Sequence, residues 1–199
     1  MDAQHNEPDD IDMARSQAAG LLAVLLARPP GPDLLDALRG LHGDASPWGQ
    51  VVNRFTEAAG EANSDDVARE YNRVFIGLQR GELVPYASYY LTGFLHDRPL
   101  MKLRTEMARL GIARAEGVGE PEDHIAAILG IYSGLIAGRF GAPAGPAEQR
   151  AFLDRHLSPW APLFFSDLEK AESARFYKAV GYAGGVLMEI ETDAHAFVD

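Results

Sequence analysis

The residues best suited to chemistry stand together at Glu120-Pro121-Glu122-Asp123-His124, where acidic side chains precede a single imidazole. Aspartate with histidine is a common general acid–base pair, and such a cluster can also attract positive charge. The stretch predicts the start of a central helix from Pro121 to about Arg139, because proline suits the first helical position and carboxylates meet the positive end of the helix dipole. Asp123 and His124 would then point about 100° apart, which makes them a poor acid–base pair. The plainest interpretation is that these residues only begin the helix well.

Metal, nucleotide and nucleophile sites are not indicated by the sequence. The six histidines are scattered and none is four residues from another, as a helical zinc motif requires. There is no phosphate-binding loop of the G-x-x-x-x-G-K-[ST] type and no G-x-S-x-G motif. The chain has no cysteine, which excludes disulfides, thiolate metal sites and cysteine nucleophiles. We therefore expect no catalytic residue, no metal and no cofactor.

An aromatic segment offers a different kind of site. Tyr86, Tyr89 and Tyr90 follow Val84 and Pro85. Aromatic residues in helical domains usually pack in the core. The functional alternative is a cleft with aromatic walls and an acidic rim from residues 120–124, which suits an apolar peptide that carries positive charge.

The elements that position these residues are predicted to be helices throughout. Caps, prolines and apolar periodicity predict about ten helices and no strand, which makes a compact all-α bundle. The expected helices cover residues 11–27, 33–41, 47–59, 65–78, 86–95, 99–110, 121–139 and 146–157, with one more starting at Ser158-Pro159 and a last one from Ser173 to about His195. Asp10 is the expected cap of the first helix. Gly181, Gly184 and Gly185 in the last helix indicate a close helix–helix approach or a break.

Composition limits the classes of partner and the domain organisation. The 199 residues are 47% hydrophobic and carry a net charge of −11, which disfavours nucleic acid and favours a basic partner. Residues 1–10 are expected to form a flexible acidic tail and residues 11–199 a single helical domain, with a possible hinge near 140–146. The apolar run Ala18–Ala27 is too short to span a bilayer and follows an acidic segment, so we expect neither an export signal nor stable membrane insertion, and a cytoplasmic protein.

Several fragments, in this order and spacing, resemble the TorD/DmsD family, the cytoplasmic chaperones of molybdoenzyme maturation. The fragments cover roughly residues 11–195. They are Glu70-Tyr71-x-x-x-Phe75-x-Gly77, Val84-Pro85-Tyr86-Ala87-Ser88-x-Tyr90, Leu103-Arg104, Gly111, Glu120-Pro121-Glu122-Asp123-His124, Phe152-Leu153-x-x-His156-Leu157-x-Pro159-Trp160 and Phe176-Tyr177.

The resemblance implies a TorD-like helical fold and a function as a chaperone rather than an enzyme. It implies binding of the twin-arginine signal peptide, and of the body, of a molybdenum or tungsten oxidoreductase, which is held back from export until its cofactor is inserted. It places peptide binding at a set of residues on the two central motifs: Pro85, Tyr86, Ser88, Tyr90, Glu122, Asp123 and His124. Many members carry tryptophan where this chain has Tyr86, so the pocket is expected to prefer a different client.

Three alternatives stay open at the level of sequence. The first is an acid–base enzyme that uses Asp123 and His124. The second is a helical regulator that binds a small molecule or a nucleotide such as GTP. The third is a purely structural helical module. The chaperone itself is expected to be a monomer or a homodimer.

Overall fold

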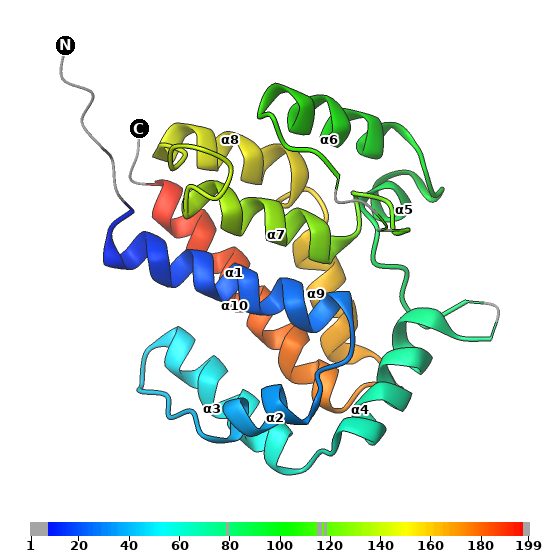
Figure 1. The fold of residues 1–199 in the computed structure, drawn as a ribbon. Coiled ribbons are helices and arrows are strands. Elements are labelled where there is room, and N and C mark those ends of the chain that lie inside the picture. The colour runs from blue at the N-terminus through cyan, green and yellow to red at the C-terminus, as the bar shows by residue number, and fades with distance from the viewer. Residues whose placement is uncertain (1–7, 79, 115–116, 118, 197–199) are drawn as a thin grey trace.

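The computed structural model describes residues 8–78, 80–114, 117 and 119–196 (Figure 1). Over these residues the chain forms helices joined by short connections, and its only extended pairing is one isolated β-bridge. The helices are α1 (Asp10–Ala27), α2 (Pro32–Arg39), α3 (Pro47–Gly60), α4 (Ser64–Tyr71), the π-helix η1 (Asn72–Ile76), α5 (Ala87–Thr92), α6 (Arg98–Arg109), α7 (Ile125–Ile136), α8 (Pro146–His156), α9 (Ala161–Lys170) and α10 (Phe176–Ala196). The all-α prediction is confirmed.

Helix α7 lies at the centre of the bundle because nearly all of its residues are apolar and buried. A helix that is hydrophobic on every side must be covered on every side. In Figure 1, α1 runs beside α7, and α8 lies along another flank. The C-terminal helix α10 packs against α1, α3 and α9. Helix α7 is therefore covered by α1 from the N-terminal part of the chain and by α8 from the C-terminal part.

Small polar residues hold α1 against α7. Ser16 Oγ donates to the carbonyl of Ser133 at 2.9 Å, and Ser133 Oγ donates to the carbonyl of Ser16 at 2.8 Å. A Cβ atom at Gly20 would lie 3.1 Å from Ser133 Oγ. Both serines are fully buried, so these hydrogen bonds satisfy groups that water cannot reach.

Two of the three glycines in α10 allow α9 to approach closely, and the helix continues through them without a break. A Cβ at Gly181 would lie 2.6 Å from the amide nitrogen of Glu169, and one at Gly184 would lie 2.0 Å from the ring of Phe165. A Cβ at Gly185 would meet nothing within 4 Å. The prediction of close helix–helix approach is confirmed, and the alternative of a break is wrong.

The start of α10 is stabilised by a residue far away in the sequence. The Glu70 carboxylate on α4 is buried and accepts hydrogen bonds from the amides of Arg175, Phe176 and Tyr177, at 2.7–3.2 Å. A carboxylate at a helix N-terminus satisfies free N–H groups and meets the positive end of the dipole. The prediction that the last helix begins at Ser173 is wrong, because Glu70 supplies the cap and the helix begins at Phe176.

Of the other predicted helix boundaries, some are confirmed and some are wrong. Ser46 caps α3, as predicted, with its hydroxyl accepting from Gly49 N at 3.0 Å. Asp9, not Asp10, caps α1. The pair Ser158-Pro159 does not start α9, which begins at Ala161 after a turn that continues from α8.

The largest error concerns the central helix. Pro121 does not start it: residues 121–123 form a turn, and α7 begins at Ile125 with His124 as its cap. The helix predicted for residues 86–95 is also shorter, because α5 ends at Thr92 and Gly93 follows in the left-handed conformation, with φ of 81°.

Most of the predicted acidic tail, residues 1–7, lies outside the described residues. Its last residue, Asp10, is the first residue of α1. Within the described part of the chain, no helix combines the length and apolar character needed to cross a membrane.

Candidate functional site

The two motifs singled out in the sequence meet in space. The segment around Tyr86 and the segment around His124 form an antiparallel bridge. The amide of Ala87 donates to the carbonyl of Asp123, and the amide of Ile125 donates to the carbonyl of Pro85, both at 2.9 Å. We call this bridged pair of segments, residues 85–87 and 123–125, the crossing. It fixes the first residues of α5 and of α7 relative to each other.

Asp123 stabilises the start of α5, the helix that follows the Tyr86 segment. Its Oδ2 accepts from the amide of Ser88 at 2.9 Å, close to the start of α5, and its side chain is only 1% exposed. Ser88 is also buried, and its hydroxyl accepts from the amide of Asp97 at 3.3 Å. Asp123 and Ser88 thus hold the backbone of residues 86–97 in place.

His124 stabilises the start of the other helix, α7. Its Nδ1 accepts from the amide of Ala126 at 3.2 Å and so caps α7. Burial lowers the pKa of His124 to about 4, against the opposing effect of Glu120 and Asp123. The ring is therefore neutral at pH 7 with its proton on Nε2, because Nδ1 is an acceptor. Asp123 and His124 bind different backbone amides, and this geometry disfavours the acid–base enzyme.

Tyr86 connects the crossing to the acidic segment. Its ring packs edge-on against His124, with 5.1 Å between the ring centroids, and its hydroxyl donates to the carboxylate of Glu120. Burial, followed by this contact with Glu120, raises the pKa of the Tyr86 hydroxyl. The tyrosine hydroxyl, which a tryptophan would lack, therefore orients Glu120.

The other rim carboxylate already has a partner. Glu122 Oε2 accepts from Arg104 Nε at 3.0 Å and from Arg104 Nη2 at 2.9 Å. Partial burial acts to raise the pKa of Glu122, but the hydrogen bond to Arg104, a backbone hydrogen bond and the charges of Arg104 and Arg114 together outweigh it, and the pKa is lowered. Glu120 is exposed, whereas Asp123 is buried, so the acidic rim consists of Glu120 and Glu122.

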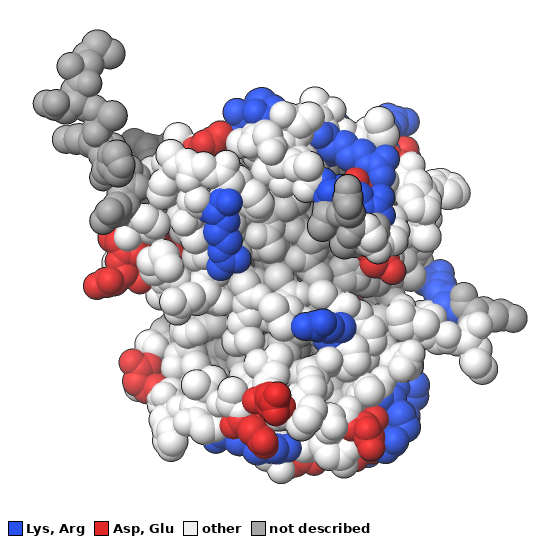
Figure 2. Space-filling view, in the orientation of Figure 1, with Lys and Arg blue, Asp and Glu red and all other residues white. Residues whose placement is uncertain are grey.

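Beside the crossing lies a cleft of about 470 Å³, which we call the apolar cleft. Its walls come from the end of α1, from α4 and η1, from α6, from α7 and from the segments around residues 112–114 and 120–122. The lining residues are Ala27, Tyr71, Phe75, Ile76, Pro85, Tyr86, Met107, Ile112, Ala113, Arg114, Glu120, Pro121, Glu122, His124, Ala126, Ala127, Gly130, Ile131 and Phe140. Figure 2 shows a face that is hollowed at its centre and largely uncharged there, with a blue cationic side chain in the middle of the hollow and the acidic side chains further out.

The π-helix η1 shapes one wall of this cleft. A π turn adds one residue to the helical ladder and so changes which side chains face a given direction. Phe75 packs against Tyr71, with 5.0 Å between their ring centroids, and Ile76 is 54% exposed beside them. Gly77 follows with φ of 63°, which ends the helix. Ile76 thus extends the apolar wall formed by Tyr71 and Phe75 to the surface of the protein.

The structure brings together part of the predicted site. Pro85, Tyr86, Glu122 and His124 line the apolar cleft. Ser88 and Asp123 do not, because they are buried beneath the crossing.

Tyr90 also lies elsewhere. It packs against Trp160 and Phe164, with 5.5 Å and 5.8 Å between ring centroids, and its hydroxyl donates to Asp167 Oδ2 at 3.1 Å. Tyr90 therefore joins α5 to α9. It packs among core residues, which is the usual place of an aromatic residue in a helical domain, and does not line the cleft.

Sequence reasoning missed several wall residues as members of the site. Met107, Ile112 and Phe140 come from three separate segments, and no spacing in the sequence links them to residues 85–124. Ile76 could have been found, since it falls off the helical stripe of Tyr71, Val74 and Phe75 immediately before Gly77.

No group of three His, Asp or Glu side chains that could hold a metal ion exists within the described ranges. The charged groups that line the apolar cleft are Arg114, Glu120 and Glu122, and most of its other lining residues are apolar. Such a surface can bind an apolar segment of a ligand and orient a charge at its end.

Comparisons with known proteins identify the family of the chain. A family model described as "Nitrate reductase delta subunit" matches residues 41–166, which is more than half of the chain and includes both motifs of the crossing. The chaperone protein TorD of Salmonella bongori is 29% identical over 144 residues, which cover 72% of this chain and 64% of that protein. TorD of Aliivibrio salmonicida is 26% identical over 134 residues, which cover 63% and 62% of the two chains. The chain thus spans less than two thirds of the length of these relatives.

The fold has a counterpart among solved structures. A crystal structure described as that of a candidate redox enzyme maturation protein from Archaeoglobus fulgidus superposes with a TM-score of 0.61 at 18% identity, and the match covers 88% of this chain and 93% of that one. At this identity the likeness concerns the fold alone. With the family model covering both motifs of the crossing, the chain belongs to the nitrate reductase delta subunit family, the family of the TorD chaperones.

Proposed function

We propose that this protein is a cytoplasmic chaperone that binds the twin-arginine signal peptide of a molybdenum or tungsten oxidoreductase in the apolar cleft. Binding would hold the enzyme back from export until its cofactor is inserted. The observation that carries the proposal is the combination of apolar walls of Tyr71, Phe75 and Ile76 with a carboxylate rim. A twin-arginine signal has the matching order of a basic start and an apolar middle.

The expected affinity follows from the size of the contacts. Burying three leucine-sized side chains contributes about 1.5–3 kcal/mol each. Ordering a flexible peptide takes back about 2–5 kcal/mol, and each exposed charge pair adds about 0–1 kcal/mol. The balance corresponds to a micromolar or weaker dissociation constant. This affinity suits a partner that must be released for export.

The three alternatives receive less support. An enzyme based on Asp123 and His124 needs both side chains to face one substrate, but each is engaged with a different backbone amide. A nucleotide site in the apolar cleft would place phosphates beside the exposed carboxylate of Glu120, which repels them. A purely structural module would not need the exposed apolar wall around Ile76.

The test is co-purification with each exported molybdoenzyme of the host, expressed with and without its signal peptide. We expect one client to be recovered, and its recovery to be lost when the signal peptide is deleted. Recovery that survives the deletion would contradict signal-peptide binding and would move the contact to the body of the enzyme. Recovery of no client at all would contradict the chaperone function.

A further inference from the structure

The apolar cleft follows α7 for two turns and then stops. The α7 residues that line it are Ala126, Ala127, Gly130 and Ile131. The next position on the same face is Gly134, because residues three and four apart share one face of a helix. Gly134 is buried and does not line the cleft. Something must therefore cover this face of α7 where the cleft ends.

Phe140 is the side chain that covers Gly134. A Cβ atom at Gly134 would lie 2.4 Å from Cε2 and 2.7 Å from Cζ of the Phe140 ring, so the ring lies directly on the backbone of α7. The side chain is nevertheless 44% exposed, and it lines the cleft. The ring of Phe140 thus forms an end wall of the apolar cleft, at the end that is farther from the crossing.

Backbone hydrogen bonds fix the position of this wall. Phe140 lies in the connection from α7 to α8 (Figure 1). Before the ring, the amide of Arg139 donates to the carbonyl of Gly134 at 2.8 Å. After it, the amide of Ala144 donates to the carbonyl of Leu135 at 2.9 Å. Because the chain is bound to α7 on both sides of Phe140, the ring is held at a set distance along the helix.

The other end of the cleft carries the exposed carboxylate of Glu120, which the Tyr86 hydroxyl orients beside the start of α7. From His124, the cap of α7, to Gly134 the helix rises by about 15 Å, since each residue adds about 1.5 Å. About ten helical residues or about four to five extended residues span this distance. The apolar part of a secretory signal has about 7–15 residues. The carboxylate and the ring are therefore separated by a distance comparable to the length of such a segment.

We propose that Phe140 determines the length of the apolar segment that the cleft accepts. This inference rests on the proposed function: the arginines of the signal peptide meet Glu120, and its apolar segment runs along α7 as far as the Phe140 ring. Residues beyond the ring turn away from α7 and stay in water. Without the ring, the apolar floor continues over Gly134 for one more helical turn, about 5.4 Å.

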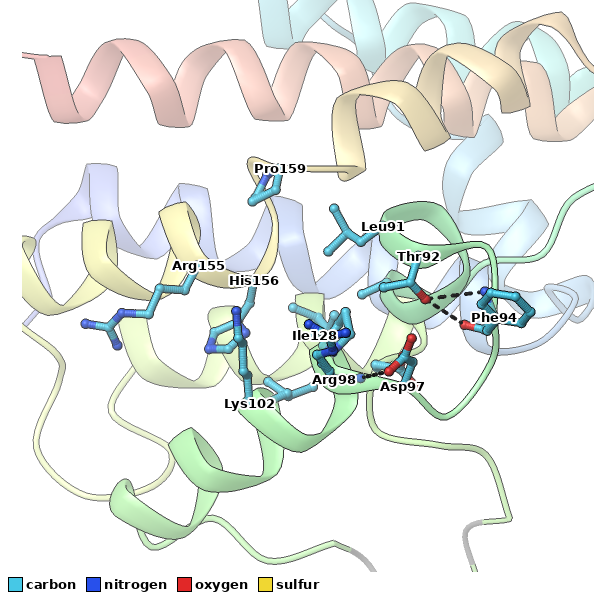
Figure 3. Close-up of a pocket in the computed structure, with 14 residues that line it drawn as sticks. Leu91, Thr92, Phe94, Asp97, Arg98, Lys102, Ile128, Arg155, His156 and Pro159 are labelled. Carbon is cyan, nitrogen blue, oxygen red and sulfur yellow. Dashed lines mark hydrogen bonds between the residues drawn. The ribbon is translucent and has the colours of Figure 1, made fainter.

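The test is a series of synthetic twin-arginine peptides whose apolar segments differ by one leucine at a time, over about 7–15 residues. Dissociation constants are measured by fluorescence anisotropy for the wild type and for Phe140→Ala. Phe94→Ala is the matched control, because Phe94 is 72% exposed and lines a second hollow between α5, α6 and α8 (Figure 3). That hollow shares no lining residue with the apolar cleft.

A second variant, Phe140→Leu, keeps a shorter apolar side chain over Gly134, and it decides the question if Phe140→Ala does not fold. We expect the wild-type affinity to rise with the length of the segment and then to level off. In Phe140→Ala the levelling is expected about two to four residues later, so that the longest peptides bind about tenfold more tightly than to the wild type. Phe140→Leu should lie between the two, and Phe94→Ala should match the wild type.

An unchanged length profile in both Phe140 variants, with signal peptides still bound, would overturn this inference and leave the proposed function standing. A shift of the same size in Phe94→Ala would overturn it as well, because that side chain lies outside the apolar cleft. If the wild type binds no peptide of any length, the proposed function itself is wrong, and the role of Phe140 is wrong with it.

Discussion

Glu120 is the exposed carboxylate at the rim of the apolar cleft, and the Tyr86 hydroxyl orients it. Glu122 differs, because Arg104 already neutralises it. If the basic start of a signal peptide meets the rim, Glu120 is therefore the residue that it meets first.

We predict that Glu120→Gln weakens binding of a twin-arginine signal peptide by up to about fivefold and makes the affinity less dependent on salt. Gln keeps the size of the side chain and an oxygen for Tyr86, so the fold is expected to be unchanged. The measurement is a peptide titration at low and high ionic strength. Glu189→Gln, an exposed change on α10, is the control. A salt dependence identical to that of the wild type would contradict a role for Glu120.

Asp123 holds the crossing in position. We predict that Asp123→Ala lowers the free energy of unfolding by about 1–3 kcal/mol, because the amide of Ser88 loses its buried partner. The affinity of the folded protein for the signal peptide should change less than twofold. Urea unfolding and peptide titration measure the two effects separately. A large loss of affinity with unchanged stability would show instead that Asp123 contacts the peptide.

His124 makes stability depend on pH. Its pKa in the folded protein is about 4, below the value of 6.5 for a free histidine, because burial disfavours the charged ring. The unfolded chain therefore binds this proton more readily. The stabilisation is complete above pH 6.5 and falls as the pH drops towards 4, by a total on the order of 3 kcal/mol.

The check is urea unfolding of the wild type and of His124→Asn between pH 4.5 and 8. Asn can still cap α7 but does not titrate. We expect the difference in unfolding free energy between the two proteins to shrink as the pH falls. The pKa of His156 is also lowered by burial, so it contributes to the slope of both proteins and cancels in the difference. A difference that does not vary with pH would contradict the buried, neutral state of His124.

At the scale of elements, the α9–α10 contact offers a matched pair of substitutions. A Cβ at Gly184 would lie 2.0 Å from the fully buried Phe165 ring, whereas a Cβ at Gly185 would meet nothing within 4 Å. We predict that Gly184→Ala destabilises the protein by about 1–3 kcal/mol and that Gly185→Ala stabilises it by up to about 1 kcal/mol. Thermal unfolding of both variants measures this. Equal effects would mean that α9 is not packed against Gly184.

The elements that were predictable from sequence are those with local signals. The cap and proline at Ser46-Pro47 start α3, and Pro146 starts α8, because each signal acts within one helical turn. The same signal failed at Ser158-Pro159, where the chain turns directly from α8 into α9. At α10 the effective cap is Glu70, more than a hundred residues away.

The site was also predictable only in part. The approach of the Tyr86 segment to the acidic stretch was expected, and the bridge confirms it. Which carboxylate is exposed was not predictable, because burial of Asp123 depends on α5 being folded over it. The π turn at η1 was missed as well, because the apolar stripe of residues 67–78 fits an ordinary helix equally well.

At the scale of the whole molecule, the crossing of residues 85–87 and 123–125 separates the apolar cleft from a second hollow between α5, α6 and α8. The two hollows share no lining residue. The same short bridge holds the walls of both in a fixed relation.

The most direct test of the central claim is the affinity of a synthetic twin-arginine signal peptide for Ile76→Asp, compared with Leu163→Asp. Ile76 is 54% exposed in the wall of the cleft and Leu163 is 58% exposed on α9, so both changes add one charge at a similarly accessible position. We predict that Ile76→Asp weakens binding at least tenfold and that Leu163→Asp leaves it unchanged, because only the first places a charge against the apolar part of the peptide. Equal affinities for the two variants would contradict binding of the signal peptide in the apolar cleft.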